Sequence, residues 1–88
     1  MKLNLFEDID HVTEPGDAII VTGKHAKSGK EIKQLITCCP GCGKISGSAG
    51  NHIYDEETKT YRPSIVHSEL LGGCGWHGWL TDGEFTKN

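Results

Sequence analysis

The hydrophobic residues of this chain alternate with polar ones over short stretches and do not recur at helical spacing for three turns. Twelve glycines and three prolines interrupt every candidate helix. β-branched residues gather in several of the short stretches, which favours strands. The pattern therefore predicts an all-β fold of six or seven short strands, at residues 17–23, 31–38, 51–55, 59–67, 74–80 and 84–86, with 2–9 forming either another strand or one helical turn.

Turn residues indicate how these strands connect. Ser28-Gly29 is typical of a hairpin tip, so the strands on either side of it are expected to pair. Asp82-Gly83 is the strongest hairpin signal in the chain and joins the last two predicted strands. Pro63 has no N–H to donate, which predicts an edge position or a bend at that point. The sequence contains no internal repeat, low-complexity stretch or linker, and we expect a single domain over residues 1–88.

The size and composition predict that this domain needs help to stay folded. A chain of 88 residues is near the lower limit at which one apolar core suffices without a metal, disulfides or a partner. The longest aliphatic run is Ala18 to Val21, too short to span a bilayer, so no membrane association is expected. We expect a soluble, cytoplasmic protein, where clustered cysteines act as metal ligands or redox groups rather than as a disulfide framework. The sequence does not indicate an oligomeric state.

Charge points to no particular partner. The net charge is −3, too small to argue for a polyanion. A short basic stretch contains Lys24, Lys27, Lys30 and Lys33. No aromatic residue lies between these lysines to stack on bases, so nucleic-acid binding is only weakly supported and a solvated surface is the simpler interpretation.

Two cysteine boxes carry the chemistry. Cys39-Pro40-Gly41-Cys42-Gly43 has the form of a zinc-ribbon knuckle, in which a proline-centred turn brings two thiolates to one tetrahedral ion. Cys74 and His77 repeat the two-residue spacing, again followed by a glycine. We therefore predict a structural zinc site with Cys39, Cys42, Cys74 and His77 as ligands, and an apo form that is largely unfolded.

Other interpretations of the cysteines stay open. Ordinary buried cysteines are one, and a redox Cys-x-x-Cys is another, although the glycine-rich segment after Cys42 is unlike the helix that such a motif requires. Cys38 is expected to lie outside the site, because a Cys38–Cys42 pair would lose the proline-centred turn. Iron, or an iron–sulfur cluster, is the alternative to zinc.

The motifs also resemble two known families. The segment from Cys74 to Trp79 is similar to the second cluster-binding box of Rieske proteins, but nothing before it supplies the Cys-x-His of their first box. "CPGCG", "YRPSIVHS" and "CGWHGWLTDGEF", in that order, resemble a family of small bacterial and phage proteins, some labelled ammonia monooxygenase. The resemblance implies a metal-stapled β domain of zinc-ribbon-like or Rieske-like shape and a phage or prophage origin. The cytoplasm is then that of a bacterium or of an infected host cell. The resemblance implies no established activity.

No catalytic constellation is apparent among the remaining residues. No serine stands in a nucleophile-elbow context, and no phosphate-binding loop is present. His52 and His67 lie on neighbouring predicted strands and could form a second metal site, although half-buried strand histidines are the simpler interpretation. Asp55, Glu56 and Glu57 are expected to be solvated. We therefore predict that the protein is not an enzyme.

The expected function is a zinc-binding interaction module, such as a phage protein that binds a host protein. The alternatives are a Rieske-like or rubredoxin-like electron carrier and a nucleic-acid-binding zinc ribbon. Trp76 and Trp79 flank the second box, and their three-residue spacing on a regular strand turns one inward and the other outward. The outward tryptophan, with Lys24 and Lys27, is the predicted partner-binding surface, while shielding of the metal and the core is the alternative role of both tryptophans.

Overall fold

The structure is a computed structural model that describes residues 1–47 and 52–88. Every regular element in this part of the chain is a strand or a single 3₁₀ turn, so the small all-β fold predicted from the sequence is confirmed. The elements are β1 (Asn4–Phe6), η1 (Ile9–His11), β2 (Asp17–Lys24), β3 (Glu31–Cys38), β4 (Ile45–Ser46), β5 (Ile53–Asp55), β6 (Thr60–Val66), η2 (Glu69–Leu71), β7 (His77–Thr81) and β8 (Glu84–Lys87).

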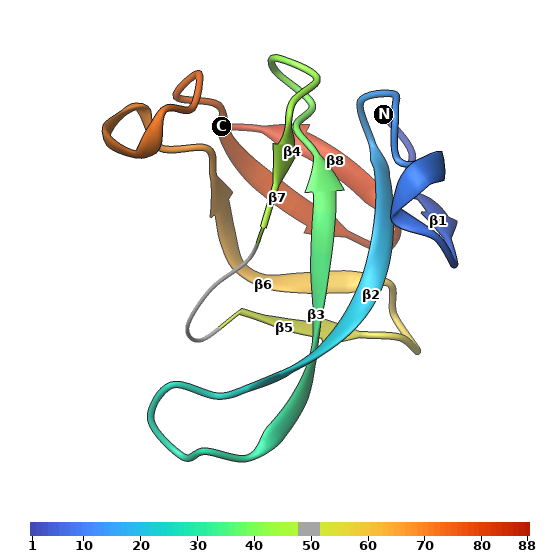
Figure 1. Cartoon of the computed structure of the whole chain (residues 1–88), viewed down its shortest axis with the longest axis vertical. Helices are drawn as coiled ribbons and strands as arrows, with labels where there is room; N and C mark the ends of the chain where they lie inside the picture. Colours follow the sequence, from blue (N-terminus) through green and yellow to red (C-terminus); the bar gives the residue numbers. More distant parts are fainter. Residues whose placement is uncertain (48–51) are drawn as a thin grey trace.

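The strands form two four-stranded sheets. The first has the order β1-β2-β3-β4, with β1 parallel to β2 and the other pairs antiparallel. The second is an antiparallel meander in the order β5-β6-β7-β8. Figure 1 shows β5 and β6 crossing β2 and β3, while the long β2–β3 hairpin extends beyond the rest of the molecule. Hydrogen bonds join the sheets where they cross, from Leu35 N to the Tyr61 hydroxyl and from Gln34 Nε2 to the His52 carbonyl.

The core lies between the two sheets and takes side chains from both. Its buried members are Leu35, Cys39, Tyr54, Tyr61, Trp76, Leu80 and Phe85. On β7 the burial alternates, since Gly78 and Leu80 are buried while Trp79 and Thr81 are exposed. This alternation gives the second sheet one face toward the core and one toward solvent. The solvent-facing side is important for the candidate active site described below.

Most of the predicted strands are confirmed, with differences at their ends. Asp82-Gly83 forms the predicted tight hairpin, with positive φ angles of 51° and 76°. Pro63 coincides with a register shift between Tyr61 and Ile65, which is the predicted bend. The segment from 74 to 76 is not part of β7, and the two-residue strand β4 was not anticipated, because a pair of residues has too little periodicity to detect.

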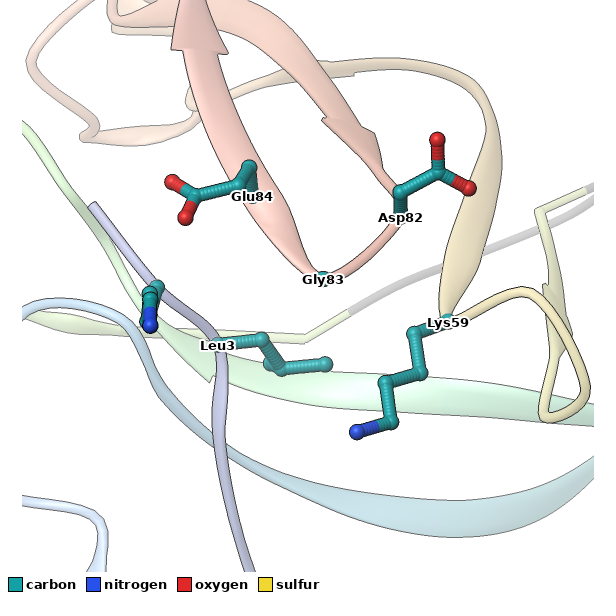
Figure 2. A pocket seen from close by; sticks show the side chains of 6 residues that line it. Leu3, Lys59, Asp82, Gly83 and Glu84 are labelled. Carbon is teal, nitrogen blue, oxygen red and sulfur yellow. The ribbon is translucent and has the colours of Figure 1, made fainter.

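The N-terminal segment forms backbone hydrogen bonds with the β7–β8 turn and the start of β8. Backbone hydrogen bonds run from Leu3 N to Gly83 O and from Phe85 N to Met1 O. A cavity of about 210 Å³ lies beside this contact, lined by Lys2, Leu3, Lys59, Asp82, Gly83 and Glu84. Figure 2 shows these residues arriving from the N-terminal segment, the start of β6 and the β7–β8 turn. Among the described residues, no helix is long and apolar enough to cross a membrane.

Candidate metal centre and candidate active site

The first cysteine box folds into the knuckle that its sequence predicts. It follows β3, and two backbone hydrogen bonds close the turn, from Cys39 N to Lys44 O and from Gly43 N to Cys39 O. Gly43 has a φ of 75°, the left-handed conformation that glycine adopts without steric cost. The N–H of Gly41 donates to the Cys39 sulfur at 3.3 Å, which stabilises negative charge on that atom. The knuckle thus presents two sulfurs on one short turn.

Four ligand atoms meet beside this knuckle. Cys39, Cys42, His67 and Cys74 each contribute one, and all four atoms lie within 4.8 Å of one another. The Cys39 and Cys74 sulfurs are 3.6 Å apart, and His67 Nδ1 is 3.3 Å from the Cys42 sulfur and 3.8 Å from that of Cys74. The edges of a tetrahedron around one zinc ion are about 3.5–3.8 Å for nitrogen and sulfur ligands. These residues are therefore positioned to hold a single metal ion.

His67 takes the place that the sequence analysis gave to His77. Three of the four predicted ligands are in the cluster, but His77 is not. The reason is strand geometry: Trp76 is buried in the core, so the next residue turns toward solvent, and its Nδ1 lies 3.1 Å from Asn88 Nδ2 instead. The knuckle-like spacing of Cys74 and His77 was misleading. His67 likewise does not form the second metal site considered with His52.

A tight loop returns the chain from His67 to Cys74. Ser68 caps η2 by accepting a hydrogen bond from Leu70 N, and Gly72 ends it with a φ of 83°. Gly73 N then donates to Ser68 O, and Gly75 N donates to His67 O at 2.7 Å. A Cβ at position 73 would collide with the His67 backbone. No short motif marks His67 as a ligand, because a loop, and not a two-residue knuckle, brings it to Cys74.

The thiols of the cluster differ in acidity. Burial, the largest influence, raises the pKa of Cys39 to about 11. Hydrogen bonding from the Trp76 backbone, with contributions from His67 and the neighbouring cysteines, lowers the pKa of Cys74 to about 7. A divalent ion binds the thiolate form and so displaces these protons. Cys74 is thus prepared for metal binding, whereas the Cys39 thiolate depends on the ion for its stability.

Cys38 lies outside the cluster, fully buried, with its thiol 3.0 Å from the Gly43 carbonyl oxygen. Burial is the first cause that raises its pKa. It packs under the knuckle, where burial shields it from oxidants.

The residues predicted to bind a partner are dispersed. Trp76 is only 8% exposed and packs against Phe85 with ring centroids 6.4 Å apart, so it belongs to the core and is not a partner contact. Trp79 is 40% exposed, as the odd spacing predicts. Lys24 ends β2 and Lys27 lies in the following hairpin loop, in the part of the molecule that extends away from the second sheet in Figure 1.

The second sheet places a serine and a histidine at the same end of two paired strands. Val66 pairs with His77 across β6 and β7, so the two share a face. Ser64 precedes Val66 by two residues, inside the irregular stretch between Tyr61 and Ile65, and is half-buried; regular strand alternation would put it on the same face, diagonal to His77. Diagonal neighbours are about 7–8 Å apart at Cα, within reach of an imidazole ring. Trp79 lies beside them, with its ring centroid 5.4 Å from that of His77.

His52 holds the backbone of the same serine. Its Nε2 lies 2.9 Å from the carbonyl oxygen of Ser64, and because a carbonyl only accepts, that nitrogen carries the proton. The His52 ring also packs on Tyr61 of the core, with centroids 5.3 Å apart. Ser64 is thus fixed from the side opposite β7.

The fold and the site define a class of protein: a small all-β domain with a Cys₃His cluster at the end of the paired strands β6 and β7. A family model described as "Bacterial ubiquitination-like system serine protease (BubE)" matches residues 6–87. The chain therefore belongs to the BubE family. No curated protein and no solved structure matches it.

This membership corrects the functional expectation. The sequence analysis predicted a non-enzymatic interaction module, with an electron carrier and a nucleic-acid-binding ribbon as alternatives, whereas the family is named for a serine protease. The prediction that the protein is not an enzyme is therefore wrong. It rested on local motifs, and a serine and histidine from different strands form no such motif. The expected small bacterial family is confirmed, while the match gives no support to a phage origin or to a Rieske-like box.

Proposed function

We propose that this protein is a serine-dependent peptidase that cleaves an amide bond in a protein of a bacterial ubiquitination-like system. Ser64 is the proposed nucleophile, His77 the general base, and Asn88 the residue that orients the base. The observation that carries the proposal is the placement of Ser64 and His77 at the same end of the paired strands β6 and β7, in a chain of a family named for a serine protease.

The other described serines support this choice by contrast. Ser28 accepts a hydrogen bond from Lys30 N at the tip of the β2–β3 hairpin. Ser68 accepts one from Leu70 N and caps η2, and the histidine next to it belongs to the metal cluster. Ser46 is on the short strand β4, on the first sheet. Of the serines in residues 1–47 and 52–88, Ser64 is the one on a strand that pairs with a strand containing a histidine outside the cluster.

The chemistry follows from the roles of the three side chains. Asn88 lies 3.1 Å from His77 Nδ1, and with its amide oxygen turned to that nitrogen it accepts the Nδ1 proton. Nε2 then has a free lone pair that takes the hydroxyl proton of Ser64 as its oxygen attacks the amide carbonyl. The same imidazole returns the proton to the departing amine, leaving an acyl-serine that water hydrolyses. A Ser-His-Asn set satisfies the nucleophile, base and orienter logic of acyl transfer.

The Cys₃His cluster is proposed to bind zinc as a structural ion. Three thiolates and one imidazole are a preferred donor set for zinc, and four protein ligands leave no open position for substrate or water. Four ligand atoms within 4.8 Å also suit one ion better than a cluster that spreads its ligands over two irons. The reducing cytoplasm of a bacterium is the proposed location, because it keeps such thiolates free of disulfides.

The test is covalent labelling with an alkyl fluorophosphonate, a reagent that phosphonylates activated serine hydroxyls and releases fluoride. The metal-loaded protein is expected to gain one phosphonyl group by intact mass, at Ser64 by peptide mapping. Ser64→Ala should abolish labelling, and His77→Ala should slow it by about 10³-fold or more. Labelling that persists in Ser64→Ala would contradict the assignment of the nucleophile.

A matched pair of control residues lies in the distal hairpin. His25 Nδ1 accepts hydrogen bonds from Lys27 N and Ser28 N, so this loop also contains a serine close to a histidine. Ser28→Ala and His25→Ala should each leave the labelling rate within about twofold, because the hairpin extends away from the second sheet. Metal content, measured by mass spectrometry, should be one zinc equivalent in all five proteins.

A further inference from the structure

The metal cluster and the proposed catalytic pair occupy the same ends of the same two strands. Ser64 lies three residues before the ligand His67, and His77 lies three residues after the ligand Cys74. Between these positions the strands pair directly, with Val66 opposite His77 and His67 N donating to Trp76 O. Each strand therefore contains one proposed catalytic residue, with a ligand just beyond the strand end and up to about 10 Å away along the chain.

The two strands are not equally well held there. β7 is anchored in the core, because Trp76 packs on Phe85 and Gly78 has no room for a Cβ beside Thr86 O and the Trp76 ring. The end of β6 is less buried, with Val66 53% exposed. The register shift between Tyr61 and Ile65 interrupts its pairing with β7, and Ser64 lies inside this interrupted stretch. Ladder hydrogen bonds are disrupted at a bulge, so contacts outside the ladder contribute to the position of Ser64.

His67 is the ligand that ties β6 to the rest of the cluster. The other three ligands come from the knuckle after β3 and from the segment before β7. Without the imidazole, the end of β6 keeps the backbone bonds of His67 to Trp76 and Gly75, but it loses its link to the ion. The Nδ1 of His67 lies 3.3 Å from the Cys42 sulfur, so the ring spans from β6 to the knuckle.

We propose that His67 is a positioning residue for catalysis: by ligating the metal ion it fixes the end of β6 so that Ser64 lies against His77. The proposal rests on the proposed function above. The ion contributes position only, and its charge does not act on the substrate. Activity then depends on metal occupancy but not on the identity of the ion, and a displacement of about 1 Å at such a pair costs on the order of 10²-fold in rate.

The first test compares His67→Ala with His67→Cys, using the concentration dependence of fluorophosphonate labelling. Three thiolates remain in His67→Ala and are expected to retain cobalt, whose visible absorption reports thiolate ligation. Its limiting labelling rate should fall about 10²-fold, while the half-saturating reagent concentration stays within about twofold. His67→Cys restores a fourth ligand and should recover the rate to within about threefold of the original. A full rate in His67→Ala, or no recovery in His67→Cys, would overturn the proposal.

The second test exchanges the ion in the unaltered protein and does not depend on any variant folding. Zinc, cobalt and cadmium forms are expected to label at rates within about threefold of one another, with superimposable pH profiles. A rate that changes more than about tenfold with the ion, or a shifted pH profile, would give the ion a chemical role and overturn the proposal. Ser64→Ala distinguishes failure of the proposed function from failure of the proposed role of His67. If Ser64→Ala is still labelled, the proposed function is wrong. If Ser64→Ala is not labelled but the labelling rate of the unaltered protein depends on the ion, only the role of His67 is wrong.

Discussion

Different interactions hold the two ends of the β6–β7 strand pair. At the Ser64–His77 end, the closure consists of side chains: four ligand atoms from the knuckle after β3 and from the two ends of the loop between β6 and β7. At the Asp82-Gly83 end it consists of backbone hydrogen bonds, from Gly83 N to Lys59 O and from Leu3 N to Gly83 O, and of the bond from Asp82 N to the Thr60 hydroxyl. We call these the metal end and the hairpin end.

Because the two ends are held by different interactions, we expect substitutions at them to have different effects on the stability of the protein. The hairpin end depends on local conformation, and each of its bonds contributes about 1 kcal/mol. The metal end depends on one ion, and structural zinc contributes about 10–16 kcal/mol of apparent binding free energy, as much as the whole net stability of a domain. A substitution that removes the ion from the metal end should therefore unfold the protein, whereas one at the hairpin end should only weaken it.

Replacing a thiolate should have the largest effect. In Cys42→Ser we expect the loss of the metal equivalent and of cooperative thermal unfolding, because the hydroxyl is a poor zinc ligand. Metal analysis and circular dichroism melting measure the two properties. Cys38→Ser is the matched control, since the neighbouring thiol lies outside the cluster, and it should retain both. A cooperative, metal-loaded Cys42→Ser protein would show that the ion does not dominate this end.

Crowding the cluster should have the next largest effect. A Cβ at Gly41 would lie 2.9 Å from the Cys74 sulfur and 2.9 Å from Trp76 Cβ, so Gly41→Ala should push a ligand out of place. We expect zinc affinity to fall by about 10- to 100-fold, measured by competition with a chelator. Gly47→Ala offers a control on the same segment, because a Cβ there meets nothing within 4 Å. Equal affinities in the two variants would contradict the packing described here.

A change at the hairpin end should be smaller and should leave the metal in place. Gly83 has a φ of 76°, and a Cβ there meets only Lys59 carbons at 3.5–3.7 Å. The cost of Gly83→Ala is therefore backbone strain, about 1–2 kcal/mol in the free energy of unfolding by denaturant. Chelator competition should give an unchanged zinc affinity. If zinc affinity falls along with stability, the two ends are coupled and the contrast between them is wrong.

The smallest effect is expected midway between the ends. Tyr54 is buried in the core, and its hydroxyl has no hydrogen-bond partner among the described residues. Burial, with nearby carboxylates, raises the pKa of this phenol, so it stays neutral and contributes an unpaired dipole. Tyr54→Phe removes that group and should raise the free energy of unfolding by about 1 kcal/mol without changing metal affinity. A loss of stability would mean that the hydroxyl is satisfied in solution.

The sequence predicted the hairpin end better than the metal end, and the two ends explain why. Asp82-Gly83 specifies its turn through its own allowed φ angles, so a dipeptide carries the information. The Cys39–Cys42 knuckle is equally local, and it too was recognised. The sequence did not indicate which of His67 and His77 is the ligand. The answer depends on the burial of Trp76, which turns the neighbouring His77 toward solvent and away from the cluster.

The candidate catalytic pair was missed for a related reason. Ser64 and His77 become neighbours only through the register of β6 on β7, and a bulge next to Pro63 sets that register. No residue spacing within a single segment of the sequence indicates this register. Local motifs therefore predicted the fold class and three metal ligands, while the activity depended on tertiary geometry.

The pairing of the N-terminal segment with β8 also sets an order of events during synthesis. Met1 and Leu3 take their backbone partners from Phe85 and Gly83, which a ribosome makes 80 or more residues later. Until then residues 1–3 have no partner on that side, and the chain must keep them from pairing elsewhere. Residues 1–3 are thus among the last in this domain to complete their hydrogen bonds.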